Sequence, residues 1–186
     1  MRSIIVFSGP CGCGKSTLAD GYARHRVRQT GRPVYVIHGD DIRWGLVEPE
    51  DTGHVFQNDG HIADPRRWEN IVRFNWDCIL LLAGRAAKEG WDVAIDYVVE
   101  EELPRLRTLA AEVGAALYYI VLTASAEALE QRIVARGDVD MLGRALFLKQ
   151  KLDALPENQG HLFDNTWLSA EEAAGKLELE RFIVVT

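Results

Sequence analysis

The sequence has few cysteines, no long hydrophobic run and no surplus of positive charge. Its three cysteines, Cys11, Cys13 and Cys78, are too few and too unevenly placed for a disulfide framework. The apolar runs at 4–7 and 79–83 are far shorter than a membrane-spanning helix, and the N-terminus lacks a signal-peptide cleavage pattern. These absences predict a cytoplasmic protein that makes no contact with membranes.

Acidic residues outnumber basic ones, 28 to 21, which gives a formal net charge of −7. A nonspecific grip on nucleic acid needs a basic face, so the charge disfavours nucleic acid as a partner without excluding a small basic pocket. The 186 residues are 47% hydrophobic and 26% charged, which is typical of one globular domain. We therefore predict a single domain over residues 1–186.

Strand-like runs alternate with helical patterns along the whole chain. Nearly continuous apolar runs, typical of strands buried on both faces, lie at 3–8, 33–38, 92–98, 117–123 and 181–185. Helical patterns lie at 15–30, 66–89, 101–113, 126–136 and 143–155, and a capping box from Ser169 to Glu172 opens a last short helix. The alternation predicts an α/β fold with a parallel sheet covered by helices. Segments 45–65 and 137–143 are irregular, which suits ligand-contacting loops and plain surface loops alike.

Residues 9–16, with the sequence GPCGCGKS, match the phosphate-loop pattern G-x-x-x-x-G-K-[ST] in full. Its glycines let the backbone wrap closely around phosphate oxygens, and the helix N-terminus that follows presents positive potential to an anion. Lys15 is expected to reach the β- and γ-phosphates and Ser16 to offer its hydroxyl to Mg²⁺. The predicted ATP-binding residues in this region are Gly9, Cys11, Gly12, Cys13, Gly14, Lys15, Ser16 and Thr17.

Two cysteines lie inside this loop. No second Cys/His cluster of suitable spacing accompanies Cys11 and Cys13, so metal binding is a weak interpretation. A thiol beside a helix N-terminus can have a lowered pKa. We therefore hypothesise that oxidation or alkylation of either thiol blocks ATP binding.

Two adjacent carboxylates and an arginine follow the second predicted strand. Ligands of open parallel sheets bind beyond the carboxyl ends of the strands, so Asp40, Asp41 and Arg43 are expected where an acceptor meets the γ-phosphate. Phosphoryl transfer to a hydroxyl needs an aspartate that orients the nucleophile and accepts its proton. Asp40 is the predicted base, and Arg43 is predicted to bind the acceptor. Alternatively, one of the two aspartates, Asp41 above all, caps a helix that opens at Ile42.

Other polar residues are candidates for metal and nucleotide contacts. Asp96, near the end of the third predicted strand, is similar to a Walker-B aspartate, which holds Mg²⁺ or contacts the acceptor; the alternative is a strand-end aspartate bonded to backbone. Asn165 and Thr166 are candidates for hydrogen bonds to an adenine edge, or else turn residues.

Three arginines are candidates for a clamp on the transferring group. Arg132 and Arg136 are four residues apart and therefore share one helix face. Arginines so placed can hold a phosphoryl group in transfer, and Arg144 follows across a short gap. A solvated helix face is an equally compatible interpretation of the same spacing.

The phosphate loop, the segment 39–43, Asp96 and the arginine helix together resemble the small P-loop kinases, a group that includes shikimate, gluconate and adenylate kinases and chloramphenicol phosphotransferase. The resemblance covers essentially the whole chain. It implies a five-stranded parallel sheet of order 2-3-1-4-5, an acceptor side at about 43–76 and a mobile lid at about 136–145. The Asp-Asp-x-Arg element at 40–43 is also similar to polynucleotide 5′-kinases, in which the first aspartate is the base and the arginine contacts the acceptor phosphate.

We therefore predict an ATP- and Mg²⁺-dependent kinase that phosphorylates a hydroxyl of a small-molecule acceptor. Its predicted catalytic residues are Asp40, Lys15, Arg132 and Arg136; its acceptor-binding residues are Asp40, Arg43, Asp96 and Arg144; its metal-binding residues are Ser16 and Asp96. One alternative is a nucleotide or polynucleotide 5′-hydroxyl kinase. Another is a nucleotide-binding regulatory ATPase without an acceptor, which the carboxylate after the second strand disfavours.

Overall fold

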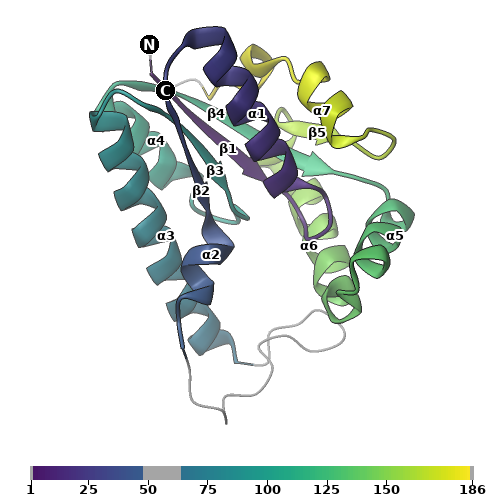
Figure 1. The fold of residues 1–186 in the computed structure, drawn as a ribbon. Coiled ribbons are helices and arrows are strands. Elements are labelled where there is room, and N and C mark those ends of the chain that lie inside the picture. Colours follow the sequence, from purple (N-terminus) through teal and green to yellow (C-terminus); the bar gives the residue numbers. More distant parts are fainter. Residues whose placement is uncertain (1, 48–63, 185–186) are drawn as a thin grey trace.

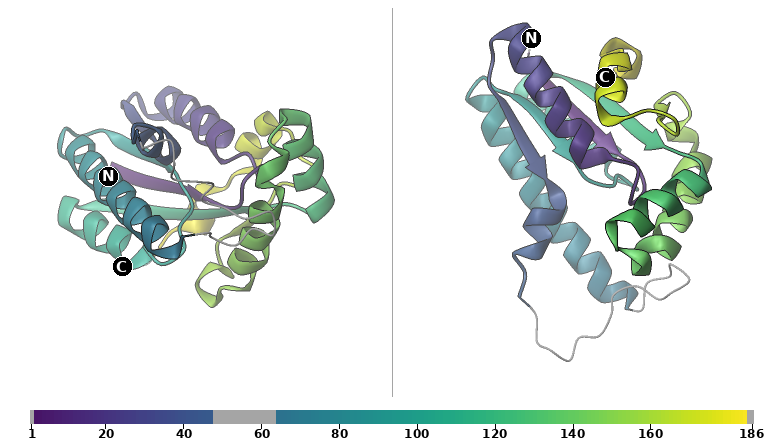
Figure 2. Two further views of the ribbon diagram at one scale, coloured as in Figure 1. Left: turned by 90° about the horizontal axis from the view of Figure 1, so that it is seen from below. Right: turned by 45° about the vertical axis from the view of Figure 1, so that its right-hand side comes forward.

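The computed structural model describes residues 2–47 and 64–184 of the chain. In this part, five strands form one sheet in the order β2-β3-β1-β4-β5, and every pairing is parallel. Helices cover both faces of the sheet (Figures 1 and 2). The predicted α/β class and the strand order are confirmed: this is the three-layer fold of the P-loop NTPases.

The elements follow the predicted alternation closely. The strands are β1 Arg2–Ser8, β2 Val34–His38, β3 Asp92–Asp96, β4 Ala115–Thr123 and β5 Leu162–Asp164. The helices are α1 Lys15–Thr30, α2 Gly39–Trp44, α3 Pro65–Lys88, α4 Leu103–Val113, α5 Ala126–Arg136, α6 Leu142–Ala154 and α7 Ala170–Lys176. Short 3₁₀ turns lie at Val139–Met141 (η2), Pro156–Asn158 (η3) and Leu179–Phe182 (η4), so most of the predicted irregular segment 137–143 is helical.

Alternate residues of the central strands supply two separate apolar cores. In β1, Ile4 and Val6 pack with residues of α3 and α4, whereas Ile5 and Phe7 pack with residues of α1 and α7. All four side chains are fully buried, as expected for a parallel sheet covered on both faces. The polar groups of the site are therefore confined to the ends of the strands.

Residues 181–184 of the predicted last strand at 181–185 do not form a strand of the sheet, and residue 185 lies outside the described residues. The fifth strand of the sheet is instead Leu162–Asp164, which pairs with Val121–Thr123 at the carboxyl end of β4. Ile183 forms only an isolated antiparallel bridge with Tyr118. Both segments lie along the same edge of β4, and the apolar run near the C-terminus packs Phe182 into the core without joining the parallel ladder.

The first residues of α7 and α3 are capped by side chains close to them in the sequence, whereas α2 begins earlier than predicted. The capping box of Ser169 and Glu172 is present at the start of α7, and Asp64 accepts a hydrogen bond from the N–H of Arg67 at the start of α3. The prediction that Asp41 caps a helix opening at Ile42 was wrong. Helix α2 already begins at Gly39, directly after β2, and its first turn contains Asp41.

Candidate active site

The phosphate loop joins β1 to α1 at the carboxyl end of the sheet (Figure 1). Gly9, Gly12 and Gly14 all have positive φ angles, of 138°, 77° and 87°. A Cβ on Gly9 would lie 2.4 Å from the carbonyl oxygen of Leu122, and one on Gly12 would lie 2.8 Å from Cγ1 of Ile133. Backbone angle and packing both require glycine here, and the loop is pressed against β4 and α5.

The cation of the loop is Lys15. Its Nζ donates a hydrogen bond to the carbonyl oxygen of Pro10 at 3.0 Å, so the side chain folds back over the loop. Burial lowers the pKa of Lys15, but the neighbouring Cys13 and Cys11, and after them Asp96 and Asp40, raise it, and the net pKa lies above the ordinary value. Lys15 therefore presents an ammonium charge at neutral pH. Ser16 follows it in the exposed first turn of α1.

Asn165 and Arg132 hold the loop from the side of β5. Asn165 Nδ2 donates to the carbonyl oxygen of Cys13 at 2.7 Å. Arg132 donates in turn to the carbonyl oxygens of Asn165 and Thr166, at 2.9 and 3.1 Å. These bonds make Arg132 a brace for the segment after β5 in the described conformation.

A small cavity of about 170 Å³ lies on this side of the loop. Thr166 is not among its lining residues, because its hydroxyl donates to Asp164 and accepts from the N–H of Ser125. In the described conformation the Thr166 hydroxyl is used within a turn, and its contact with a nucleotide stays a prediction. The cavity is lined by Cys13, Gly14, Thr17, Leu18, Arg132, Asn165, Leu168, Ala170 and Ala173.

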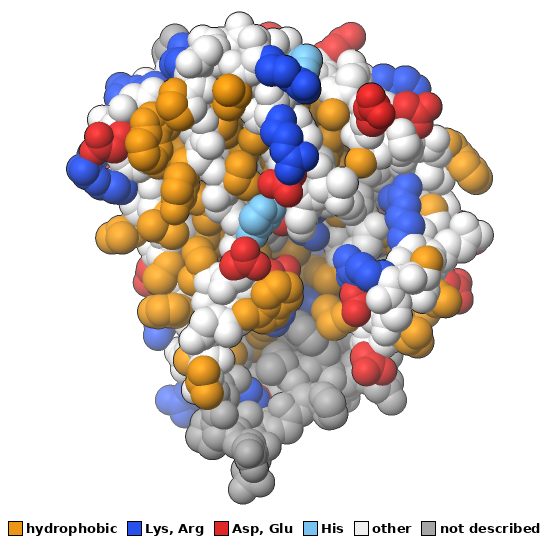
Figure 3. Space-filling view, in the orientation of Figure 1, with side chains coloured by type: hydrophobic (Ala, Val, Ile, Leu, Met, Phe, Trp, Pro, Cys, Tyr) orange, Lys and Arg blue, Asp and Glu red, His pale blue; other side chains and the backbone are white. Residues whose placement is uncertain are grey.

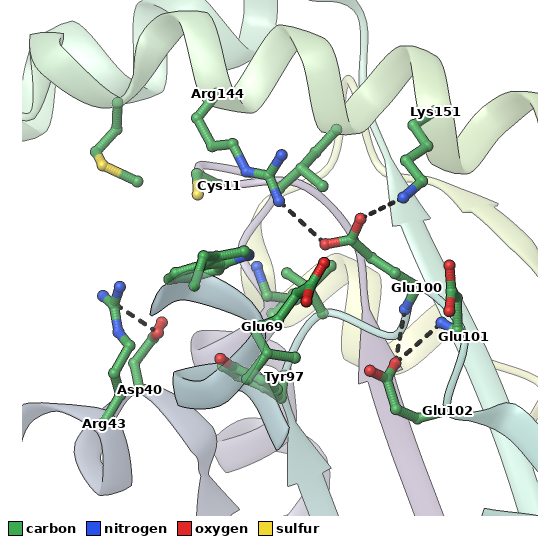
Figure 4. A pocket seen from close by; sticks show the side chains of 16 residues that line it. Cys11, Asp40, Arg43, Glu69, Tyr97, Glu100, Glu101, Glu102, Arg144 and Lys151 are labelled. Carbon is green, nitrogen blue, oxygen red and sulfur yellow. Dashed lines mark hydrogen bonds and ion pairs between the residues drawn. The ribbon is translucent and has the colours of Figure 1, made fainter. Parts of the chain in front are cut away.

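A larger cavity of about 360 Å³ opens on the other side of the loop (Figure 4). Five segments contribute to it: the phosphate loop, α2, α3, the turn after β3, and η2 with α6. It is lined by Cys11, Lys15, Asp40, Arg43, Trp68, Glu69, Val72, Tyr97, Val98, Glu100, Glu101, Glu102, Met141, Arg144, Leu148 and Lys151. The predicted base, the loop lysine and two predicted acceptor-binding arginines therefore share one cavity.

The predicted base lies on the first turn of α2. The side chain of Asp40 is 56% exposed, and its Oδ1 lies 3.6 Å from the guanidinium of Arg43. Arg43 also lies 5.8 Å from the ring centroid of Trp68, which fixes its direction across the cavity. Asp41 is exposed and is not among the lining residues. Of the two adjacent aspartates, only Asp40 lines the large cavity.

Close packing sets the position of α2. Asn75, which is fully buried on α3, donates to the carbonyl oxygen of Gly39 at 2.8 Å. Gly39 also lies against Tyr97, whose ring leaves no room for a Cβ there. Burial, with a smaller contribution from the charge of Asp40, raises the pKa of Tyr97 to about 12, so its hydroxyl keeps its proton.

Asp96 lies at the end of β3 and is tied to two neighbouring elements. Its Oδ2 lies 3.1 Å from Nδ1 of His38, at the end of β2, and Nε2 of the same histidine lies 3.3 Å from Asp20 on α1. Burial lowers the pKa of His38, but Asp96 and Asp20 raise it above its ordinary value. The side chain of Asp96 is only 7% exposed, so the bond to His38 supplies the partner that a buried carboxylate needs.

The three predicted clamp arginines separate in the structure. Arg132 faces the small cavity, and Arg144 lines the large one with only 4% of its surface exposed. Arg136 lies on an exposed surface, forms an ion pair with Asp138 and lines neither cavity. A four-residue step from Arg132 thus leaves Arg136 outside both cavities in the described conformation, and its catalytic role stays a prediction.

The thiols of the loop also differ from each other. Cys13 is fully buried, and burial raises the pKa of its thiol. The predicted lowering of its pKa was wrong, because the side chain turns into the core instead of towards solvent. Cys11 is partly exposed and lines the large cavity.

Several lining residues escaped the sequence analysis. Tyr97 follows β3 directly and Glu100 lies four residues after its end, so the rule that ligands bind beyond strand ends could have found them. Lys151 lies seven residues after Arg144, two turns along the same face of α6. Residues 48–63 of the predicted acceptor side lie outside the described residues.

The described part of the chain contains neither a preformed metal cluster nor a membrane-spanning helix. No group of three or more His, Cys, Asp or Glu side chains in this part is arranged to hold a metal ion. None of the helices at 2–47 and 64–184 is long and apolar enough to cross a membrane.

Comparison with known proteins identifies the family. Residues 4–151 match the model of a family described as an AAA domain, and because this match spans more than half of the chain, the chain belongs to that family. No curated protein matched the sequence.

Several solved structures share the fold. The APS kinase of Mycobacterium tuberculosis, in complex with AMPPNP and APS, is 20% identical with a TM-score of 0.61, and the match covers 94% of each chain. A sugar kinase from a Janibacter species is 19% identical with a TM-score of 0.62, covering 98% of this chain and 95% of that one. The tunicamycin resistance protein of Deinococcus radiodurans is 17% identical with a TM-score of 0.61, covering 95% and 93%. The expected resemblance to P-loop kinases therefore holds for the fold.

Proposed function

We propose that the protein is an ATP- and Mg²⁺-dependent kinase that phosphorylates a hydroxyl group of a small molecule. The observation that carries this proposal is that Lys15 of the phosphate loop and Asp40 of α2 line one cavity of about 360 Å³. A cation for the γ-phosphate and a carboxylate for the acceptor hydroxyl are the two groups that such a transfer needs within reach of each other.

The phosphate loop divides the two cavities, which supports a direction for the nucleotide. Cys13 and Gly14 border the small cavity, whereas Cys11 and Lys15 border the large one. A nucleotide laid over the loop would place its base and ribose near Thr17, Arg132 and Asn165. Its γ-phosphate would then face the acceptor cavity.

Ser16 and Asp96 are the residues proposed to hold Mg²⁺. The Ser16 hydroxyl follows the loop lysine directly, and Asp96 is a buried carboxylate whose charge acts on Lys15. Oxygen donors of this kind suit Mg²⁺, which takes one or two protein groups and completes its shell with phosphate and water. When bound, the ion would neutralise charge on the β- and γ-phosphates.

In the proposed reaction, Asp40 accepts the proton of the acceptor hydroxyl as the oxygen attacks the γ-phosphorus. The bond to the β-phosphate oxygen breaks, and ADP leaves. Lys15 and the loop N–H groups stabilise the phosphate charge, and Arg144 faces the transferring group from α6. Arg43, which is held near Asp40 and over Trp68, is positioned to bind the acceptor.

A screen of hydroxyl compounds with γ-labelled ATP tests the proposal. Sugar acids, nucleosides, hydroxylated antibiotics and an oligonucleotide with a free 5′-hydroxyl form its arms, each scored against background hydrolysis. A labelled small molecule is the expected product. Label on the oligonucleotide alone would support the 5′-hydroxyl kinase instead. Partner binding that changes with ATP, without any labelled product, would support a regulatory ATPase.

The Asp40→Asn variant tests the base. We expect it to bind ATP normally but to transfer phosphate at least ~100-fold more slowly, the scale of general-base loss. Asp41→Asn makes the same change one residue outside the cavity and serves as the matched control, while Lys15→Ala should lose ATP turnover. Transfer by Asp40→Asn at the wild-type rate would remove Asp40 from this role.

A further inference from the structure

A single carboxylate bridges two cations at the wall of the large cavity. Glu100, in the turn after β3, accepts from Arg144 at 3.0 Å through Oε1 and from Lys151 at 2.6 Å through Oε2 (Figure 4). The two cations lie two turns apart on one face of α6. The bridge therefore joins α6 to the turn that follows β3.

The turn that carries Glu100 is itself fixed to the phosphate loop. The N–H of Val99 donates to Oγ of Ser8 at 2.9 Å, and Ser8 is the residue directly before Gly9. A second carboxylate, that of Glu102, accepts from the N–H groups of Glu100 and Glu101 at 3.0 Å each. The position of Glu100 relative to the loop is thus set by hydrogen bonds on both sides.

Arg144 is the cation whose position matters most. Its side chain is only 4% exposed, yet it borders the same cavity as Lys15 and Asp40. A guanidinium so deeply buried needs a fixed partner, and its planar group also lies 5.3 Å from the ring centroid of Phe147. Its direction across the cavity is therefore determined by neighbours and not by solvent.

We propose that Glu100 is a positioning residue for phosphoryl transfer: it holds the Arg144 guanidinium where that cation stabilises the negative charge of the transferring group. The inference rests on the proposed function, because it places the γ-phosphate at Lys15. Glu100 itself is not proposed to touch the substrate. It acts through Arg144.

Lys151 explains how Arg144 keeps its attraction for an anion. Glu100 paired with Arg144 alone would be a neutral unit. Because Lys151 takes the second oxygen, the three side chains together carry a net charge of +1 and still favour the phosphoryl group. We therefore expect the loss of the Lys151 charge to weaken transfer, but only while Glu100 is present.

A double-mutant cycle tests this arrangement. We would measure kcat and KM for MgATP in two reactions: transfer to the acceptor found by the screen, and hydrolysis with water as the only acceptor. Arg144→Ala should lower kcat about 100-fold, the scale of losing one fixed donor to the transition state. Glu100→Gln should lower kcat at least ~10-fold through misplacement of Arg144, with KM for ATP nearly unchanged. In the Arg144→Ala background, Glu100→Gln should have no further effect on kcat.

Lys151→Gln is the second variant, since its half-exposed side chain can be replaced with little effect on folding. We expect Lys151→Gln to lower kcat several-fold in the wild-type background and to cause no further decrease in the Glu100→Gln background. Glu112→Gln, an exposed charge change on α4, is the control for net charge.

The outcomes separate the two proposals. If the wild-type protein transfers phosphate and Glu100→Gln has the same kcat, this inference alone is overturned. The same holds if the fold-reductions in kcat of Glu100→Gln and Arg144→Ala simply multiply in the double variant. A change confined to KM would assign Glu100 to binding and overturn the positioning role. Absence of transfer to any hydroxyl by the wild-type protein would refute the proposed function, and this inference with it.

Discussion

One glycine determines where the proposed base lies. A Cβ on Gly39 would lie 2.4 Å from the ring of Tyr97, so Gly39→Ala must displace either Tyr97 or α2. We expect a loss of about 1–3 kcal/mol in the free energy of unfolding, the range for overpacking, together with slower transfer because Asp40 moves. Urea denaturation and steady-state kinetics measure the two effects.

Gly21→Ala is the matched control for that substitution. Gly21 lies inside α1, and a methyl group added there would meet open space, so alanine should stabilise the helix by about 0.5–1 kcal/mol. Equal stability of Gly39→Ala and Gly21→Ala would contradict the close packing of Gly39 on Tyr97.

The reactivity of the cysteines follows their burial. Cys13 is fully buried and its thiol pKa is raised, whereas Cys11 and Cys78 are partly exposed. We expect Ellman's reagent to label two thiols of the native protein quickly and the third only after unfolding, since the thiolate is the reacting form. Peptide mapping identifies the protected residue. Rapid native labelling of Cys13 would show that the loop opens.

At the scale of elements, a buried ion cluster ties α1 to the amino end of β3. Asp92, fully buried, accepts from the backbone N–H of Ser3 at 2.9 Å, from Arg26 at 3.1 Å and from Arg32 at 3.3 Å. Asp92→Asn should cost about 3 kcal/mol of unfolding free energy, because it leaves arginine charge without its partner. ATP affinity should stay unchanged, since the phosphate loop lies at the opposite end of the sheet.

An exposed ion pair provides the contrast in the same urea measurement. Arg85 and Glu89 pair near the end of α3 with side chains 73% and 43% exposed. Glu89→Gln should change the unfolding free energy by no more than about 0.5 kcal/mol, as for most surface pairs. A comparable loss in both variants would mean that burial does not determine the strength of these pairs.

Elements with many local signals could be predicted from the sequence, and those that depend on remote contacts could not. Helices α1 and α5 have the predicted bounds because their periodic apolar residues and terminal glycines are local features. The three residues of β5 have no such pattern and form a strand only because the edge of β4 is available. Helix α2 starts early for a similar reason, since Gly39 is held by Asn75 and Tyr97.

At the scale of the whole molecule, one histidine makes stability depend on pH. Nδ1 of His161 lies 3.0 Å from the carbonyl oxygen of Tyr119, and burial lowers the pKa of His161. The unfolded chain therefore binds this proton more readily, so the contribution of His161 is present above the ordinary histidine pKa of about 6.5. It is lost as pH falls through the lower pKa of the folded state.

Thermal denaturation of wild type and His161→Gln at several pH values measures this effect. As the pH falls from about 7.5 to about 5.5, the Tm of wild type should fall further than that of the variant, which cannot titrate at this position. Parallel Tm profiles for the two proteins would show that His161 has no such linkage.

The net charge of −7 does not describe how the charged side chains are distributed. On the described part of the face shown in Figure 3, basic side chains are interspersed with acidic ones and form no broad basic band. The large cavity is lined by four cations, Lys15, Arg43, Arg144 and Lys151, and by five carboxylates, Asp40, Glu69, Glu100, Glu101 and Glu102. The cavity is therefore of mixed charge, and the described part of this face lacks the basic band that the backbone of a nucleic acid needs.

Local patterns were enough to specify the phosphate loop, the alternation of strands and helices, and the position of Asp40 after a strand. These features depend on neighbouring residues, through glycine torsions, apolar periodicity and the rule of strand ends. Three other features emerge only in the folded chain: Arg132 braces the loop, Arg136 stays at the surface, and Glu100 holds Arg144. The pairings of Arg132 and Arg144 join residues 33 and 44 positions apart, and no local pattern specifies which distant partner a side chain meets.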